Sequence, residues 1–573
     1  MNLQRPNPYF RRSVAAYLCL TSLLATALAQ TAPAPTPSAN ANSPARLVPV
    51  ETAVPASTAE TVVLSPFEVV NDTKGYYSAN TMSGTRFNSR IDDLAASITV
   101  ITKEQMQDFA MLDINDVFLY TANTEGTGTF TDYTMDRNGQ LTDNVQGNPT
   151  QANRVRGIAS ANVSYGNFET QGRVPLDPLI MDGVEISRGP NANVFGLGNA
   201  SGTVNQVPVS ANLTRDFTRA QLRGDSTDGY RSTLDVNRVL IRNKLSLRAS
   251  AAFQHDGFVR KPSGVNTERY NFMAKFSPFK NTTISAAYLH YRMYGNRPNF
   301  TPPRDYVSSW LAAGRPSWDP ILQVAHLNGQ TIGNGGVGTT TPITADANVP
   351  DYFTRAGAVQ TRSNIYVDQT GLAYWTTNNT NNPASNPFTP AANNQTIRLM
   401  QTSAGAGTAS LNGGAFGRIT NQPLFTTTPS VSNKSIYDWS EVNLSSVNRL
   451  MDRTDTYNVS VDQLFFNTPR HSLAGQIGFF REDSQRYKRT PIGDSGNSGQ
   501  SGQLFADPNE SLLDGSANPF FGRTYIGAAE PIVRWQPAKW DTYRAQLAYK
   551  LDLRDHPGFF KWLGVQQLSV YDE

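Results

Sequence analysis

Few residues of this chain have the types and spacing that catalysis or metal binding requires. No glycine-rich phosphate loop, Ser/His/Asp order or paired-carboxylate motif stands out. The single cysteine, Cys19, lies in an N-terminal apolar run, so we expect a mature chain without disulfides, thiol catalysis or Cys-ligated metals. The histidines are dispersed at separations that match no metal-ligand pattern: His255, His290, His326, His471 and His556. The sequence therefore predicts a protein that is not an enzyme and needs no metal or cofactor.

The most unusual stretch runs from Met181 to Asn205. Val184 and Ile186 alternate with polar neighbours as in a strand, and an extended pattern resumes at the end of the stretch. Between them the chain is broken by a proline and several glycines, for which we favour a structural role in tight turns. This pattern predicts a small, tightly turned β unit that joins a compact domain to the longer strands that follow.

The composition limits the partners and the fold class. The chain has 49 basic and 46 acidic side chains, so its overall charge predicts no surface for nucleic acid. Hydrophobic residues make up only 39%, yet aromatic residues reach 10%. The mean hydropathy is −0.42. This combination is typical of a β protein with amphipathic strands, and no later segment approaches the ~18 apolar residues of a membrane-spanning helix.

The first 70 residues are predicted to be a targeting segment, a tether and a short docking segment. Residues 1–29 combine arginines, a short apolar run and an Ala-Leu-Ala site, which predicts a cleaved secretory signal peptide; a retained membrane anchor is the alternative. Residues 30–59 are rich in Pro, Ala, Ser and Thr and are expected to form a disordered linker. Residues 60–70 are β-prone, and could either pair with a sheet edge of another protein or form the first strand of the next domain.

Residues 71–214 show mixed α and β patterns that predict a small α+β domain. Residues 97–102 alternate as a strand. Residues 103–119 place apolar side chains near one helical face, with Thr102 as the expected N-cap and Asp113 as a point where a second helical turn could begin. Residues 123–152 are polar and rich in Gly, Thr and Asn, as in a long loop.

From residue 215 onward, long segments alternate between an apolar and a polar face. Their lengths of ~10 residues or more suit tilted strands that cross a bilayer, and the links between them are alternately short and long, as in outer-membrane barrels. A soluble β-sandwich, in which the apolar face meets a second sheet, is the alternative. A further hairpin is expected near residues 365–375. We place nine strands, near residues 218–224, 230–239, 244–255, 267–276, 282–294, 455–466, 471–482, 540–553 and 564–571.

Residues 183–205 resemble the plug-domain signature of TonB-dependent outer-membrane receptors, in which an "IEVLRGP…YG…GGxxN" run closes the plug. Ser83-Gly-Thr-Arg86, the strand at 97–102 and Arg156-Gly157 occur in the order that the family shows, and residues 60–70 then resemble the TonB box. The signature positions carried over by this resemblance are Arg156, Gly157, Glu185, Arg188, Gly189, Pro190, Gly196, Gly198, Gly202 and Asn205. The candidate TonB box is Glu60, Thr61, Val62, Val63, Leu64, Ser65, Pro66, Phe67, Glu68, Val69 and Val70.

The resemblance implies a membrane β-barrel of about 22 strands that encloses the plug. Residues 215–573 offer too little chain for that many strands beside two long inserts, so we expect the barrel to be truncated at its C-terminal end: an incomplete gene model, a fragment or a decayed copy. The expected organisation is therefore a plug domain at 71–214 followed by a partial transmembrane barrel at 215–573.

The function implied by the resemblance is that of a monomeric TonB-dependent receptor in the outer membrane of a Gram-negative-type bacterium. It would bind an external small molecule, a siderophore–iron complex or an oligosaccharide, and pass it to the periplasm with energy delivered by the TonB complex. A surface adhesive or structural barrel without active transport, or a non-functional fragment, is the alternative. Arg188 is expected to retain the plug by bonding to a wall carboxylate such as Asp462 or Glu482. The candidate ligand contacts are Phe130, Tyr133, Arg137, Tyr165 and Phe168, and ordinary loop packing is the alternative for each of them.

Overall fold

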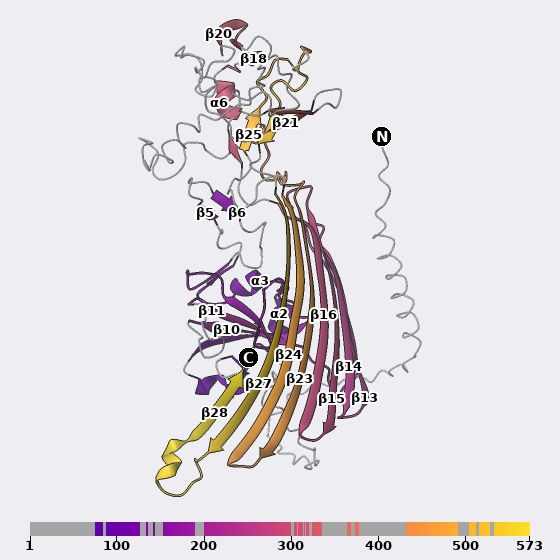
Figure 1. The fold of residues 1–573 in the computed structure, drawn as a ribbon, viewed down its shortest axis with the longest axis vertical. Coiled ribbons are helices and arrows are strands. Elements are labelled where there is room, and N and C mark those ends of the chain that lie inside the picture. Colours follow the sequence, from indigo (N-terminus) through magenta and orange to yellow (C-terminus); the bar gives the residue numbers. More distant parts are fainter. Residues whose placement is uncertain are drawn as a thin grey trace, which may run out of the picture. The chain divides into compact units, whose positions relative to one another are not determined.

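The computed structural model describes residues 75–83, 88–94, 96–126, 153–189, 200–298, 431–490 and 532–573, with shorter pieces of 133–143, 303–334, 364–376 and 503–527. The predicted signal peptide, the predicted linker and the candidate TonB box therefore lie outside the described residues. The elements fall into a small α+β domain, one large antiparallel sheet, and short elements from the long connections (Figure 1). No helix among the described residues is both long and apolar enough to cross a membrane.

A five-stranded sheet with the order β3-β10-β11-β8-β9 organises the small domain. The central strand β10 (Met181–Arg188) is almost wholly buried between β3 (Ser97–Thr102) and β11 (Gly202–Pro208), and β11 continues in parallel to β8 (Asn162–Tyr165). The smaller elements are β1 (Asn80–Thr81), β2 (Ser89–Arg90), η1 (Ile91–Asp93), β4 (Thr124–Glu125), β5 (Tyr133–Met135), β6 (Leu141–Asp143), β7 (Arg154–Val155) and β9 (Phe168–Glu169).

The predicted helix at 103–119 exists as two short helices, α2 (Lys103–Asp108) and α3 (Ile114–Phe118). Thr102 caps the first by accepting a hydrogen bond from the amide of Gln105, and Asp113 caps the second through the amide of Asn115. The chain turns between them at Ala110, which has a φ of +54°. Both predicted N-caps are confirmed, including the second helical start at Asp113, and the turn between the helices brings Met111 into the same core as Met106.

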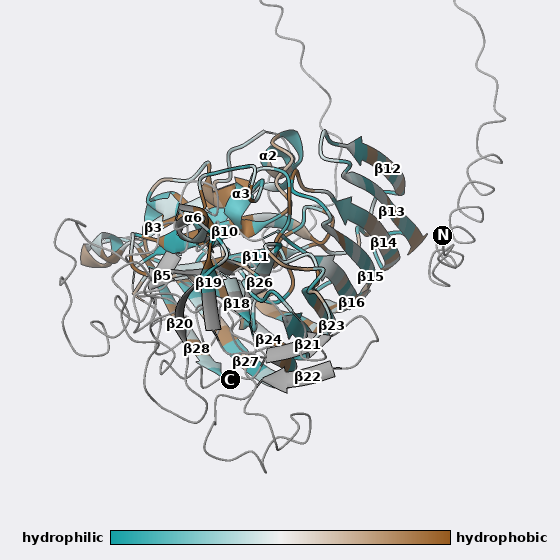
Figure 2. Cartoon of the chain, turned by 90° about the horizontal axis from the view of Figure 1, so that it is seen from above, coloured by the Kyte–Doolittle hydropathy of each residue, from teal (hydrophilic) through white to brown (hydrophobic). Residues whose placement is uncertain are grey.

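The large sheet contains nine antiparallel strands that pair strictly in chain order, and Figure 2 shows them succeeding one another along a curved line. All nine predicted strands are confirmed, most of them longer than predicted. Within the described residues β12 and β28 form the two edges. The strands are β12 (Phe217–Gly224), β13 (Tyr230–Ile241), β14 (Leu245–Asp256), β15 (Gly264–Phe279), β16 (Thr282–Asn296), β23 (Arg449–Asn467), β24 (His471–Thr490), β27 (Ile532–Asp552) and β28 (Val565–Asp572).

The connections alternate along the sheet as the sequence predicts. One end, here called the short-turn end, carries the links 242–244, 280–281, 468–470 and 553–564. The other end carries the links 225–229 and 257–263 and the two long segments, 297–448 and 491–531. This parity follows from antiparallel pairing of neighbours, since every second link must return to the same end.

Each strand of the sheet has two chemically different faces. The inner face contacts the small domain and is largely polar, whereas the outer face exposes side chains such as Phe272, Ile477 and Tyr543. The apolar face predicted for β14 points outward, as a lipid-facing strand requires. In β16 the apolar positions Leu289 and Tyr291 instead point inward and are buried, because the small domain supplies their packing partners.

The two long segments fold together locally. β17 (Arg304–Asp305) pairs in parallel with β25 (Gln503–Ala506), and β25 pairs with β26 (Thr524–Gly527). A separate core around Trp310 of α6 (Val307–Ala312) joins both segments. The predicted hairpin near 365–375 is confirmed as β21 (Asn364–Val367) and β22 (Ala373–Thr376). The other elements are β18 (Ser317–Asp319), β19 (Val324–Leu327), β20 (Gln330–Asn334) and η4 (Phe559–Leu563).

Candidate functional site: the contact between the small domain and the large sheet

Glu185 is the buried centre of the small domain. Its side chain is fully buried on β10, where one carboxylate oxygen accepts a hydrogen bond from the amide of Met82 at 2.8 Å. The other oxygen accepts bonds from the hydroxyl of Ser83 at 2.7 Å and from the side-chain amide of Asn205 at 2.9 Å. A buried carboxylate must be fully hydrogen-bonded to be tolerated. Two residues of the family signature, Glu185 and Asn205, therefore fix the N-terminal segment at 82–83 to the central strands.

Asn205 extends this network to the turn between β8 and β9. Its side-chain oxygen accepts hydrogen bonds from the hydroxyl of Ser164 at 2.9 Å and from the amide of Asn167 at 2.8 Å. Gly166 and Asn167 both have positive φ, 57° and 63°, which is the geometry of a type I′ hairpin turn. This places Phe168 directly after a rigid two-residue turn.

Phe168 inserts from this turn into a socket on the inner face of the large sheet. Its ring stacks on Phe480 of β24, with 5.2 Å between centroids and 10° between planes. The guanidinium carbon of Arg544 on β27 lies 3.7 Å from the centroid of the Phe168 ring, a cation–π distance. A Cβ atom at Gly478 would lie 2.9 Å from the Phe168 ring, so glycine is needed there to leave room. We call Gly478, Phe480 and Arg544 the Phe168 socket.

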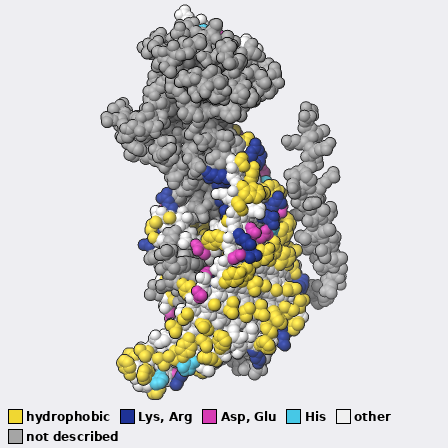
Figure 3. Space-filling view, in the orientation of Figure 1, with side chains coloured by type: hydrophobic (Ala, Val, Ile, Leu, Met, Phe, Trp, Pro, Cys, Tyr) yellow, Lys and Arg dark blue, Asp and Glu magenta, His cyan; other side chains and the backbone are white. Residues whose placement is uncertain are grey.

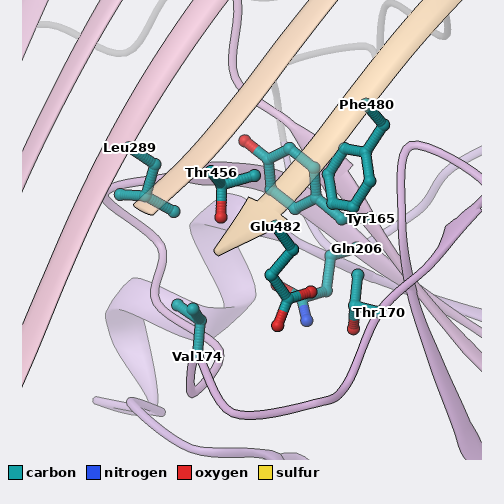
Figure 4. A pocket seen from close by; sticks show the side chains of 8 residues that line it. All are labelled: Tyr165, Thr170, Val174, Gln206, Leu289, Thr456, Phe480 and Glu482. Carbon is teal, nitrogen blue, oxygen red and sulfur yellow. The ribbon is translucent and has the colours of Figure 1, made fainter. Parts of the chain in front are cut away.

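A small cavity lies beside the socket, and Figure 4 shows the side chains that line it from both domains. Its volume of about 20 Å³ has room for about one water molecule. Glu482 reaches it from β24, with one oxygen accepting a hydrogen bond from the amide of Gln171 at 3.2 Å. The other oxygen of Glu482 is buried without a hydrogen bond to the described residues. Nearby, Arg173 donates to the hydroxyl of Ser484 and to the carbonyl of Gln536.

A second contact between the small domain and the large sheet is an ion cluster around Asp177. Its carboxylate is fully buried, and Arg231 of β13 donates to both of its oxygens at 2.8 Å. Arg269 of β15 lies 3.3 Å from the same carboxylate and also donates to the carbonyl of Pro175 at 2.9 Å. Burial alone favours the neutral acid, but the two guanidinium groups and the amide of Leu179 outweigh it and hold the pKa of Asp177 below its ordinary value.

Arg188 does not bind the wall carboxylates predicted for it. It donates to the carbonyl of Ala122 at 3.0 Å and to the hydroxyl of Thr99 at 2.7 Å, both within the small domain. The predicted partner was wrong because the end of β10 pairs with β3, where groups of the small domain take up the guanidinium of Arg188. Arg188 and Gly189 line an open hollow of about 840 Å³ with Arg156 and Gly157. The hollow gathers four signature positions, and Glu125 contributes an acidic side chain to it.

Other predicted site residues are placed as follows. Gly202 has a φ of +120°, and a Cβ there would lie 2.1 Å from the carbonyl of Ser187, so the signature requires glycine at this position. Tyr165 and Phe168, predicted as ligand contacts, are buried against Phe480 and join the two domains instead. Tyr133 lies on β5, where only its backbone is described. The residues outside the described part are Pro190, Gly196, Gly198, Phe130, Arg137 and the candidate TonB box.

The ion cluster and the Phe168 socket were not identified from the sequence. Arg231 and Arg269 occupy inward positions of alternating strands, so their polarity was visible but their partner was not. Nothing local marks Asp177 as that partner, since 54 residues separate it from Arg231. Gly478 could have been noticed as a glycine inside a long strand pattern, which often marks a close approach of another group.

Comparisons with known proteins give relatives over part of the chain, and no family model matches. The chain is 29% identical over 315 residues to the ferripyoverdine receptor of Pseudomonas aeruginosa, an alignment that covers 51% of this chain and 36% of the receptor. It is 29% identical over 188 residues to the metal-pseudopaline receptor CntO of the same species, covering 32% of this chain and 25% of that receptor. A structure of P. aeruginosa FpvA bound to a heterologous pyoverdine–iron complex aligns with a TM-score of 0.42 at 13% identity, covering 86% of this chain and 54% of that one.

The chain thus spans about a third of the length of the first of these relatives and a quarter of the second. The similarity to TonB-dependent receptors, predicted from residues 183–205, is confirmed by these relatives.

Proposed function

We propose that this chain acts as an outer-membrane receptor that binds an external siderophore–iron complex and passes it to the periplasm. The observation that carries the proposal is the distribution of polarity in the large sheet. On the part of the strands nearer the short-turn end, most side chains that face away from the small domain are apolar, whereas the inner face carries buried ion pairs, one of which joins Arg231 to Asp177 of the small domain. A soluble sandwich would show the opposite arrangement, with its apolar face buried against a second sheet.

The outer face also has the boundaries that a membrane band requires. Toward the end with the long segments, the outer face carries ion pairs, Arg453 with Asp455 at 3.0 Å and Arg481 with Asp541 at 2.6 Å, and beyond them β27 exposes the apolar side chains Val533 and Trp535. Figure 3 shows hydrophobic side chains gathered over the part of the sheet near the short-turn end and charged side chains beyond them. This pattern supports strands that cross the hydrocarbon layer below the ion pairs.

In this proposal the small domain is a plug that closes the path along the inner face. The Asp177 cluster and the Phe168 socket hold it to the wall, and Arg188 ties the end of β10 to β3. Residues 60–70 would pair with TonB as an added strand, and the pull would reach the plug through the segment at 82–83 that Glu185 holds. No catalytic role is proposed for any residue, and the receptor is proposed to work as a monomer.

The ligand class is proposed from the relatives, which are receptors for ferripyoverdine and metal-pseudopaline. Because Tyr165 and Phe168 are buried against the wall, the proposed ligand contacts reduce to Phe130, Tyr133 and Arg137. Signal-peptide cleavage after residue 29 remains part of the same proposal.

The test is uptake of radioactive ferric siderophore by cells that express the full chain as their only candidate receptor. Deleting residues 60–70 is expected to abolish uptake and to leave binding at the cell surface unchanged. The matched control is a deletion of the same length inside the 30–59 linker, which is expected to retain uptake. Uptake that survives the first deletion would refute the coupling to TonB, and a chain that neither binds nor transports any siderophore would refute the receptor.

A further inference from the structure

The short-turn end of the large sheet carries an unusual concentration of exposed aromatic and basic side chains. The most prominent feature is the link at 553–564, where η4 exposes Phe559, Phe560 and Trp562 by 75%, 54% and 78%. Gly558 and Gly564 flank η4 with φ of +82° and +62°, so the chain is shaped to present this turn. Turns in water rarely expose three large aromatic rings together, and such a patch indicates a contact surface.

The same end of neighbouring strands continues the apolar surface. The residues just before the turns are exposed and large, and they lie at the ends of strands whose outer faces are apolar. The contact surface is therefore continuous with the proposed membrane band and needs no separate partner to explain it. The exposed residues are Leu240, Ile241, Phe279, Phe465 and Phe466.

Immediately beyond this apolar rim, the turns are basic. Arg242 and Lys244 occupy the first turn, Lys280 the second, and Arg470 the third, and all four are exposed. None of the four forms an ion pair with a carboxylate of the described residues. Lys561 adds a cation within η4, where it lies 6.0 Å from the centroid of the Trp562 ring. At the opposite end, the link at 225–229 carries Asp225 and Asp228, and the link at 257–263 carries Arg260 and Lys261.

We propose that the short-turn end is a docking surface for anionic phospholipid headgroups, with the turn at 553–564 as its anchor in the headgroup layer. Aromatic rings at the hydrocarbon boundary followed by cations at the depth of the phosphates match the chemistry of that layer. The proposal rests on the proposed function for the direction in which the sheet crosses the membrane. It adds the lipid class and the residues that select it.

The experiment measures binding of the full chain, held in detergent and then diluted, to vesicles of phosphatidylcholine alone or mixed with phosphatidylglycerol. Vesicle flotation gives the bound fraction, and quenching of tryptophan fluorescence by brominated lipid reports whether Trp562 enters the bilayer. We expect the wild-type chain to prefer the mixed vesicles, and we expect the Trp562→Phe variant to lose a quenchable component.

Neutralising the turn cations with R242Q, K244Q, K280Q and R470Q is expected to reduce the preference for mixed vesicles by at least about tenfold, since each cation near an anionic surface contributes appreciably to binding. The matched control neutralises four exposed cations of the long segments and their borders, Arg315, Lys434, Arg449 and Arg523, and is expected to keep the preference.

Equal loss in both quadruple variants would overturn the proposal, because total charge and not the turn surface would then select the lipid. Equal binding of the wild-type chain to both vesicles, or no binding to either, would overturn it as well. Siderophore uptake in cells tests the proposed function separately, so a chain that transports without any lipid preference would refute only the present inference.

Discussion

Gly478→Ala is the substitution that tests most directly whether the Phe168 socket holds the small domain to the wall. An added Cβ would lie 2.9 Å from the Phe168 ring, closer than real contacts allow, and the ring cannot move freely because Phe480 and Arg544 enclose it. Overpacking of this kind costs about 1–3 kcal/mol. Phe168→Ala removes the ring itself and should cost about 3–5 kcal/mol, because Phe168 is only 2% exposed.

The two changes should not add. Once Phe168 is alanine, an added Cβ at position 478 meets no ring. The small domain should therefore dock on the sheet about as tightly in the double variant as in Phe168→Ala alone. The expected coupling is therefore close to the whole cost of Gly478→Ala.

The assay is hydrogen exchange of the amides of Gly166 and Asn167, which donate to the Gln206 carbonyl and the Asn205 side chain at 2.8 Å. If opening of the turn limits their exchange, each 1.4 kcal/mol makes exchange about tenfold faster, so Gly478→Ala should accelerate it by roughly 5- to 150-fold. The control is Gly475→Ala, which changes a glycine of the same strand that contacts Phe465 rather than the plug. Additive effects in the double variant, or unchanged exchange in Gly478→Ala, would refute the socket.

Three further predictions concern carboxylates of the small domain. Asp177→Asn should weaken docking of the small domain by about 3–5 kcal/mol, because it leaves Arg231 and Arg269 buried without their anion. In the wild type the pKa of Asp177 is held low, so the stabilisation is complete above the ordinary pKa of an aspartate and is lost only as pH falls below about 4. Protease sensitivity of the small domain, measured against pH, tests both expectations. Glu185→Gln should release the segment at 82–83, seen as faster exchange of the Met82 amide, and unchanged exchange would contradict the network. Burial raises the pKa of Asp113 to about 6, so the free energy of unfolding should fall by up to about 3 kcal/mol as pH rises from 4 to 6. Asp113→Asn keeps the N-cap and should make the melting temperature independent of pH across that window. A melting temperature that still falls with pH as in the wild type would count against the assignment.

Much of this fold could be predicted because its signals are local. Alternation with a period of two located every strand of the large sheet, and the side chains of Thr102 and Asp113 located the starts of both helices. The place at which the first helix ends, before Ala110, could not be predicted, since it depends on where Met111 finds its packing partners. The strand ends were also underestimated, because pairing with β24 carries β27 through residues 532–539 although Pro537 argues against a strand there.

The candidate site, too, has some features that the sequence predicts and others that depend on tertiary packing. The sequence by itself predicted two strands within 183–205 that resemble the plug signature, and positive φ and close approach restrict residue choice at positions such as Gly202. It also determined which strand positions are polar. Only the tertiary structure decided that Asp177 meets Arg231, that Phe168 occupies the space left by Gly478, and that Arg188 bonds within its own domain. Those pairings join residues tens to hundreds of positions apart, and no local property of either partner specifies the other until the small domain packs against the sheet.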